Sequence, residues 1–314
     1  MLVERSDRLR MSFTGDGAKT ALGGLVTNDV AALVSGLGQR AAALTPKGRV
    51  IALLRVVDRG TDVLVDADAA AATGFVSMIR KYVNPRLAKY TDLTTTTACL
   101  GVYGEGAAAF VARALAVEGA ALAALLPHGG AWFGEQDQAV YVVRSTDLTP
   151  AGYDLIGARD RLSQLHTALV DGGCAVATAD DVTIARVEAG IPEWGRDLDA
   201  ETIPQEALLD ELGAISFNKG CYTGQEVVAR IHFRGHVNRQ LRWLTAGEPI
   251  PSGARVLDLE GKEVGDVRTS VRSPSRGPLA IAMVRREIEP GSEVRVVGPT
   301  GEISARASRM TASA

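Results

Sequence analysis

One short segment of the chain combines residue types and spacing that predict reactive chemistry. In the octapeptide at 219–226, Lys-Gly-Cys-Tyr-Thr-Gly-Gln-Glu, a single cysteine follows a lysine by two positions. Thr223 and Glu226 have the spacing of a capping box, so we expect a helix to begin at Thr223. The positive end of that helix and the Lys219 ammonium both stabilise a thiolate. We therefore predict that Cys221 is a reactive, working cysteine assisted by Lys219.

The same cysteine has other interpretations. Cysteines are among the most buried residue types, so inert packing is one alternative. Cys221, His232 and His236 are possible zinc ligands, but Gly235 is expected to end the helix between the two histidines, and a fourth ligand is missing. A cysteine hydrolase in which Cys221 pairs with one of the histidines also stays open. We predict no metal site.

The octapeptide resembles the K-G-C-[FY]-x-G-Q-E signature of the YgfZ-type folate-binding proteins, relatives of the glycine-cleavage T-protein, and every fixed position is filled. Other segments of the chain resemble the family's motifs in the family's order. They are residues 13–18, 25–30, 44–50, 186–192 and 203–206. The resemblance implies a T-protein-like fold with a central channel that binds folate, and it implies that Cys221 lies at that channel.

The resemblance also implies which residues contact the ligand, tetrahydrofolate or a one-carbon derivative. Glu188, in the R-x-E-A-G motif, is the residue that holds the pterin in T-protein relatives, and one carboxylate suits the paired N–H donors of that ring. An ion pair with Arg186 is the alternative interpretation. The other candidate ligand contacts are Tyr222, Gln225, Asn28, Asp29 and Arg49. Tyr222 and Trp194 have flat rings that can stack on a pterin, and Arg49 can meet the anionic tail.

One segment departs from the pattern of the aminomethyl-transferring T-proteins. These proteins carry a G-G-x-x-D-D-type segment whose aspartate lies near the reacting nitrogens. The matching segment of this chain, residues 48–54, contains no acid. Apolar side chains neither transfer a proton nor stabilise a developing cation. The sequence therefore argues against aminomethyl transfer by the usual route.

Composition limits the classes of protein that fit. The chain has 314 residues, is 46% hydrophobic, and has a net charge of −3, so nucleic acid is an unlikely main partner. Its three cysteines are widely spaced, which disfavours a disulfide framework and indicates a reducing cytoplasm. We expect no secretory signal, and the alanine-rich stretch at 107–126 contains charges that disfavour a membrane span.

The spacing of apolar residues predicts an α+β protein. Strands are expected at 9–13, 50–57, 61–65, 93–103 and 139–144, and helices at 67–82, 105–116, 158–170 and 182–189. Short strands between Gly and Pro turns in the last third predict a C-terminal β-barrel. With the resemblance, we expect two intertwined α+β units and this barrel. We expect three domains. Residues 1–150 form an N-terminal α+β folate-binding region, and residues 151–238 form a second α+β segment that carries the motifs at 186–192 and 219–226. Residues 239–314 form the barrel.

The leading hypothesis is a tetrahydrofolate-binding protein that supports iron-sulfur cluster assembly or repair through Cys221. The resemblance supplies this role, and it implies iron-sulfur client or assembly proteins as partners. Two alternatives are a folate-dependent aminomethyltransferase or demethylase and a folate-binding scaffold without chemistry. The sequence leaves open whether the protein catalyses a reaction.

Overall fold

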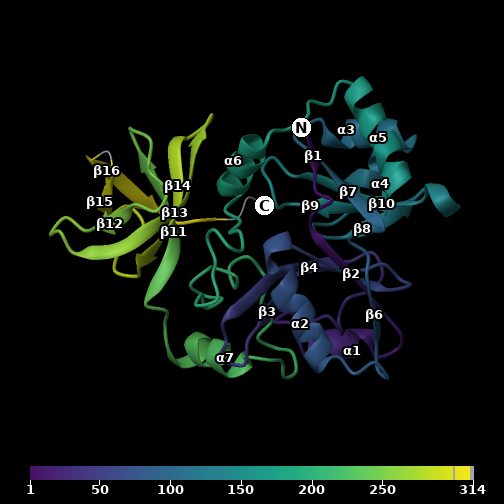
Figure 1. Ribbon diagram of the computed structural model, residues 1–314, viewed down its shortest axis with the longest axis horizontal. Coiled ribbons are helices and arrows are strands. Elements are labelled where there is room, and N and C mark those ends of the chain that lie inside the picture. Colours follow the sequence, from purple (N-terminus) through teal and green to yellow (C-terminus); the bar gives the residue numbers. More distant parts are fainter. Residues whose placement is uncertain (300, 312–314) are drawn as a thin grey trace.

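The computed structural model describes residues 1–299 and 301–311, which form two five-stranded sheets and a closed barrel. Figure 1 shows the barrel on one side of the molecule and the two sheets stacked on the other side. All neighbouring strands in these three bodies are antiparallel. This arrangement confirms the predicted α+β fold with a C-terminal barrel.

The first sheet has the strand order β3-β4-β5-β2-β6. Its strands are β2 Leu9–Thr14, β3 Gly38–Leu44, β4 Val50–Asp58, β5 Val63–Ala67 and β6 Lys89–Asp92. The helical elements are α1 Ala18–Gly23, the 3-10 turn η1 Ala69–Ala71 and α2 Ala72–Tyr82. The apolar positions of α2, including Phe75 and Ile79, are buried with those of the strands, which accounts for the core of this unit. The predicted strands at 50–57 and 61–65 are β4 and β5, which pair antiparallel as a hairpin.

The second sheet has the order β1-β7-β10-β9-β8. Its strands are β1 Leu2–Glu4, β7 Thr97–Tyr103, β8 Gly130–Phe133, β9 Val140–Ser145 and β10 Gly152–Ala158. The helices are α3 Ala107–Leu115, α4 Gly119–Ala123 and α5 Arg159–Asp171, and a 3-10 turn, η2, spans Gln136–Gln138. Because β1 pairs with β7 whereas the next strand, β2, joins the first sheet, the two units are intertwined.

Two further helices lie between the sheets and the barrel in the sequence. They are α6 Ala179–Ala189 and α7 Gln225–Arg234. A capping box between Thr178 and Asp181 begins α6. The capping box expected at Thr223 is wrong, because α7 begins at Gln225 after Gly224, which has a φ of 82° and provides no side-chain cap. The hydroxyl of Thr223 instead faces the carbonyl oxygen of Gly24, so packing of this loop decides where the helix starts.

The barrel closes in the order β11-β14-β13-β12-β15-β16, with β16 paired to β11. Its strands are β11 Arg239–Ala246, β12 Arg255–Leu257, β13 Glu263–Ser273, β14 Gly277–Arg285, β15 Glu293–Gly298 and β16 Gly301–Ser308. Alternate residues fill the interior, as in Leu244 and Ala282. Residues on the other side of these strands pack towards α6, where the Trp243 indole N–H donates to the Val187 carbonyl at 2.9 Å.

Among the described residues, no helix has both the length and the apolar character that a membrane span requires. The alanine-rich stretch at 107–126 forms the two short helices α3 and α4.

Candidate functional site

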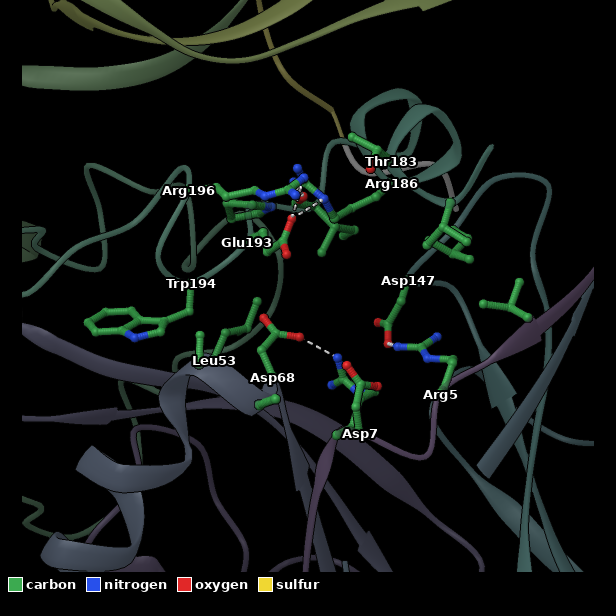
Figure 2. A pocket seen from close by; sticks show the side chains of 18 of the residues that line it. Arg5, Asp7, Leu53, Asp68, Asp147, Thr183, Arg186, Glu193, Trp194 and Arg196 are labelled. Atoms are coloured by element: carbon green, nitrogen blue, oxygen red, sulfur yellow. Dashed lines mark hydrogen bonds and ion pairs between the residues drawn. The ribbon is translucent and has the colours of Figure 1, made fainter. Parts of the chain in front are cut away.

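A cavity of about 480 Å³ lies between the two sheets and the segment that follows α6. Figure 2 shows this cavity with charged side chains pointing into it from several sides. Its apolar lining includes Leu53, Leu54, Leu148, Ile191 and Pro192, and its charged lining includes arginines and carboxylates. The cavity therefore offers both apolar surface and several hydrogen-bonding groups to a ligand, as small-molecule sites do.

One side of the cavity is an ionic cluster that joins the two sheets. Asp147 lies 3.3 Å from an Arg5 nitrogen and 3.2 Å from an Arg40 nitrogen. Behind it, Asp154 lies 2.6 Å from an Arg55 nitrogen, and both side chains are buried. Although burial alone raises the pKa of Asp147, the guanidinium groups of Arg55, Arg40 and Arg5 hold it well below its ordinary value. This wall is therefore a fixed array of charges.

Two further sets of charged side chains also line the cavity. Arg8 donates to the Asp68 carboxylate from the first sheet. Opposite them, Glu193 lies 3.2 Å from the Nε atom of Arg186 and 3.6 Å from Arg196. Burial raises the pKa of Glu193, and the Asp68 charge adds to this rise, whereas Arg186 and Arg196 offset part of it. Glu193 is thus a partly buried carboxylate that faces the cavity (Figure 2).

Trp194 follows Glu193 directly and also lines the cavity (Figure 2). Its indole is half-buried and packs near the cores of both the first sheet and the barrel side. A large flat ring beside acceptor carboxylates suits a planar ligand with N–H donors.

Glu188 does not line this cavity. Its carboxylate accepts hydrogen bonds from the hydroxyls of Ser273 and Ser275, which lie at the turn between β13 and β14. The alternative interpretation, an ion pair between Glu188 and Arg186, is also not formed, because the Arg186 guanidinium contacts Glu193 and Asp197. The structure thus places Glu188 against the barrel.

Three other predicted residues lie around Lys219, which ties the octapeptide to the segment between α1 and β3. The Lys219 ammonium donates to the carbonyl oxygens of Gly23, Val26 and Asn28 at 2.6, 2.7 and 3.0 Å. Burial lowers the pKa of Lys219 to about 8. The ammonium also lies 5.0 Å from the centre of the Tyr222 ring.

Asn28 and Asp29 lie in the turn whose backbone accepts a hydrogen bond from Lys219. The Asn28 amide donates to the Arg40 and Gly213 carbonyls at 2.7 and 2.8 Å, and the Asp29 carboxylate accepts from the Ala31 amide at 3.1 Å. These side chains therefore use their polar groups to hold backbone in place.

Cys221 is exposed, whereas Cys99 and Cys174 are buried. Gln225 is the first residue of the adjacent helix α7, and Arg49 donates to the Glu201 carbonyl. Figure 1 places α7 at the end of the molecule that is remote from α6. None of the eight predicted site residues lines the cavity in the part of the chain that the structure describes.

The histidines near Cys221 take separate positions. His232 lies in α7 and stacks on Phe217 with 3.6 Å between ring centres, whereas His236 follows the end of the helix. Over residues 1–299 and 301–311, no group of three or more His, Cys, Asp and Glu side chains has a metal-binding arrangement.

The chain matches the family model described as the GCVT N-terminal domain over residues 1–219. It belongs to this family. Similar curated proteins, each named tRNA-modifying protein YgfZ, include those of Shigella boydii serotype 18 (strain CDC 3083-94 / BS512) and Escherichia coli (strain SE11). Each is 28% identical to the chain, and the match covers 94% of the chain and 88% of the relative.

A crystal structure of glycine cleavage system aminomethyltransferase T from Bartonella henselae matches with a TM-score of 0.89 and 22% identity, covering 98% of this chain and 85% of that one. This match confirms the T-protein-like fold predicted from the motifs. In this member of the GCVT family, the acid-free segment contributes Leu53 and Leu54 to the cavity, while Ala52 is fully buried.

Most of the charged groups that line the cavity of this GCVT family member were not selected from the sequence. They are Glu4, Arg5, Asp7, Arg8, Arg40, Arg55, Asp68, Asp147, Glu193 and Arg196. Among the charged and aromatic lining residues, the sequence pointed only to Arg186 and Trp194. The available signal was that residues 193–196 directly follow the family motif at 186–192.

Proposed function

We propose that this protein binds tetrahydrofolate in the cavity and supports iron-sulfur cluster assembly or repair in client enzymes through Cys221. The observation that carries the folate part is the cavity of about 480 Å³ in a member of the GCVT family, with Trp194 and carboxylates on its lining. A reduced pteridine is flat and rich in N–H donors, so aromatic stacking and acceptor oxygens suit it.

The exposure of Cys221 supports the second part of the proposal. An accessible thiolate is a ligand for iron and an acceptor for sulfane sulfur, and buried thiols are inert in both respects. Because Cys221 does not line the cavity, the folate site and the thiol act as separate parts of the protein. We place this activity in the cytoplasm, where three unpaired cysteines stay reduced.

Two measurements test this proposal. The first is anaerobic calorimetric titration of the protein with tetrahydrofolate, which we expect to show one site per chain. The second is activity of iron-sulfur enzymes in cells that lack the protein and carry Cys221→Ser or, as a control, Cys174→Ala. We expect only Cys221→Ser to lower client activity. Unchanged activity with Cys221→Ser would leave a folate-binding scaffold, and loss with both variants would point to abundance rather than to the thiol.

The folate-dependent transferase or demethylase remains the alternative activity for the same cavity. The apolar Leu53 at the acid-free segment disfavours it, because this side chain cannot transfer a proton. The alternative predicts turnover of an aminomethyl or methylamine donor that survives Cys221→Ala.

Direct action on tRNA is a second candidate function, because the curated relatives are named tRNA-modifying proteins. Arg230, Phe233 and Arg234 share the exposed side of α7, and Phe233 is 67% exposed. Cations around an exposed aromatic ring suit unpaired bases and phosphates. Anisotropy of fluorescent tRNA should then rise with the protein and respond to Arg234→Glu. No binding at about 0.1 M salt would exclude this candidate.

A further inference from the structure

The exposed side of α7 carries an aromatic ring between two cations, at the periphery of the molecule (Figure 1). Phe233 is 67% exposed, which makes it the most exposed aromatic side chain among the described residues. Arg230 lies three residues before it and four before Arg234, so the three side chains share one side of the helix. Both arginines are exposed, and neither forms an ion pair within the described part of the chain. A large apolar ring with charges beside it is typical of a binding surface.

The opposite side of α7 holds the helix in place. Val228 is fully buried, and its backbone carbonyl accepts a hydrogen bond from the Gln205 side chain at 2.8 Å. A Cβ atom at Gly48 would lie 2.7 Å from the Cβ atom of Val227, so the turn around Gly48 packs closely on the helix. Because this side is fixed, the exposed side is a preformed surface that needs little reordering when a partner binds.

Ring contacts bring the loop that carries Cys221 along the same helix. Phe217 stacks on His232 with 3.6 Å between ring centres and meets Phe233 edge-on at 6.4 Å. Residues 218–224 then return from the last turn of α7 to its start, and Cys221 is exposed in the middle of this return. A helix of this length is about 15 Å long. The thiol and Phe233 therefore lie within the footprint of one partner, which covers about 800 Å² on each protein.

The cations around Phe233 determine which partner charge is complementary. Lys47, in the turn that packs on α7, is also exposed and forms no ion pair within the described residues. By contrast, Arg239, which follows the helix, pairs with Glu206 at 2.9 Å. The helix itself contains one acid, Glu226. The surface is therefore positive on a chain whose net charge is −3, and it complements carboxylates.

We propose that this α7 surface docks a partner protein that presents an apolar pocket surrounded by carboxylates. The α7 surface consists of Lys47, Arg230, Phe233 and Arg234. The inference rests on the proposed function, since the partner is then the iron-sulfur client that Cys221 serves. An aromatic anchor in a pocket, with charges around it, is a common arrangement in protein–protein interfaces. Nucleic acid suits the surface less well, because salt-sensitive binding of a polyanion uses about 6–10 phosphate contacts and the surface has fewer unpaired cations.

The first test is fluorescence anisotropy of a labelled acidic peptide that contains leucine, titrated with the full-length protein at about 0.02 M salt, where exposed charges are little screened. We expect saturable binding to wild type and at least about 10-fold weaker binding to Phe233→Ser and Arg234→Glu. Two matched controls, Leu126→Ser and Lys262→Glu, should bind like wild type. Leu126 is 60% exposed, and Lys262 is exposed in the turn between β12 and β13. A peptide with lysines in place of its acids should not bind.

Two results of this titration would overturn the proposal. One is the absence of saturable peptide binding below about 1 mM. The other is binding to Phe233→Ser and Arg234→Glu that equals binding to wild type. Fluorescent tRNA is titrated in parallel. If it binds more tightly than the peptide and loses this binding in Arg234→Glu, the surface belongs to nucleic acid and the docking proposal is wrong.

Client activity in cells separates this inference from the proposed function. We expect Phe233→Ser to lower the activity of iron-sulfur enzymes as far as Cys221→Ser does, while a thiol reagent still labels Cys221 in the purified Phe233→Ser protein. Leu126→Ser should leave client activity unchanged. If Cys221→Ser lowers activity and Phe233→Ser does not, the docking proposal alone fails. If neither variant lowers activity, the proposed function fails, and the peptide titration alone decides whether the surface docks an acidic partner.

Discussion

Replacing Asp154 by asparagine should destabilise the protein by disrupting the ionic cluster between the two sheets. Asp154 is 0% exposed, lies 2.6 Å from an Arg55 nitrogen, and accepts from the Tyr103 hydroxyl at 2.7 Å. Asparagine keeps the size of the side chain but removes its charge, so a buried guanidinium loses a counter-ion. Breaking a buried pair in this way costs about 3–5 kcal/mol, which is a large share of a domain's total stability.

Urea unfolding at pH 7, followed by circular dichroism, measures this loss as a lower unfolding midpoint with an unchanged slope. Glu293→Gln is the control, because its ion pair with Arg306 is 55% and 62% exposed and should contribute less than about 1 kcal/mol. If Asp154→Asn lost no more stability than this control, the ionic cluster would not stabilise the contact between the two sheets as the short distances indicate.

Three other predictions concern single side chains. First, Asp147 has a folded-state pKa below its unfolded value of about 3.9, so its stabilising effect is complete above that value and is lost as the pH falls. Between pH 5 and pH 3 the urea midpoint of the wild type should therefore fall more than that of Asp147→Asn. Equal losses would contradict this prediction. Second, a thiol reagent should label one cysteine per native chain, Cys221, and reach Cys99 and Cys174 only in denaturant; fast native labelling of either buried thiol would disagree with the structure. Third, Lys219→Met should lower the free energy of unfolding by about 2–4 kcal/mol, because three backbone carbonyls lose a charged donor. Lys219→Arg should lose less stability than Lys219→Met. A melting temperature of Lys219→Met equal to that of the wild type would show that these contacts contribute little.

Local sequence patterns predicted much of the fold. Alternating apolar residues located β2, and continuous apolar runs located β4 and β5. The Gly and Pro turns of the last third predicted the barrel, because strand patterns and turn chemistry act over a few residues. The start of α7 was misjudged because Thr223 faces Gly24, a residue nearly 200 positions away in the chain. No local pattern contains that contact.

The sequence by itself determined the family, the sheet-forming segments and the presence of one distinctive cysteine motif. Only the tertiary structure decided which side chains share a cavity, since Arg8, Asp68, Asp147 and Glu193 come from four distant segments that meet when two intertwined sheets pack together. It also decided that Lys219 donates to three backbone carbonyls, because an ammonium binds whichever acceptors the fold brings near it. Spacing along the chain specifies local structure, whereas charge partners are chosen by distance in space.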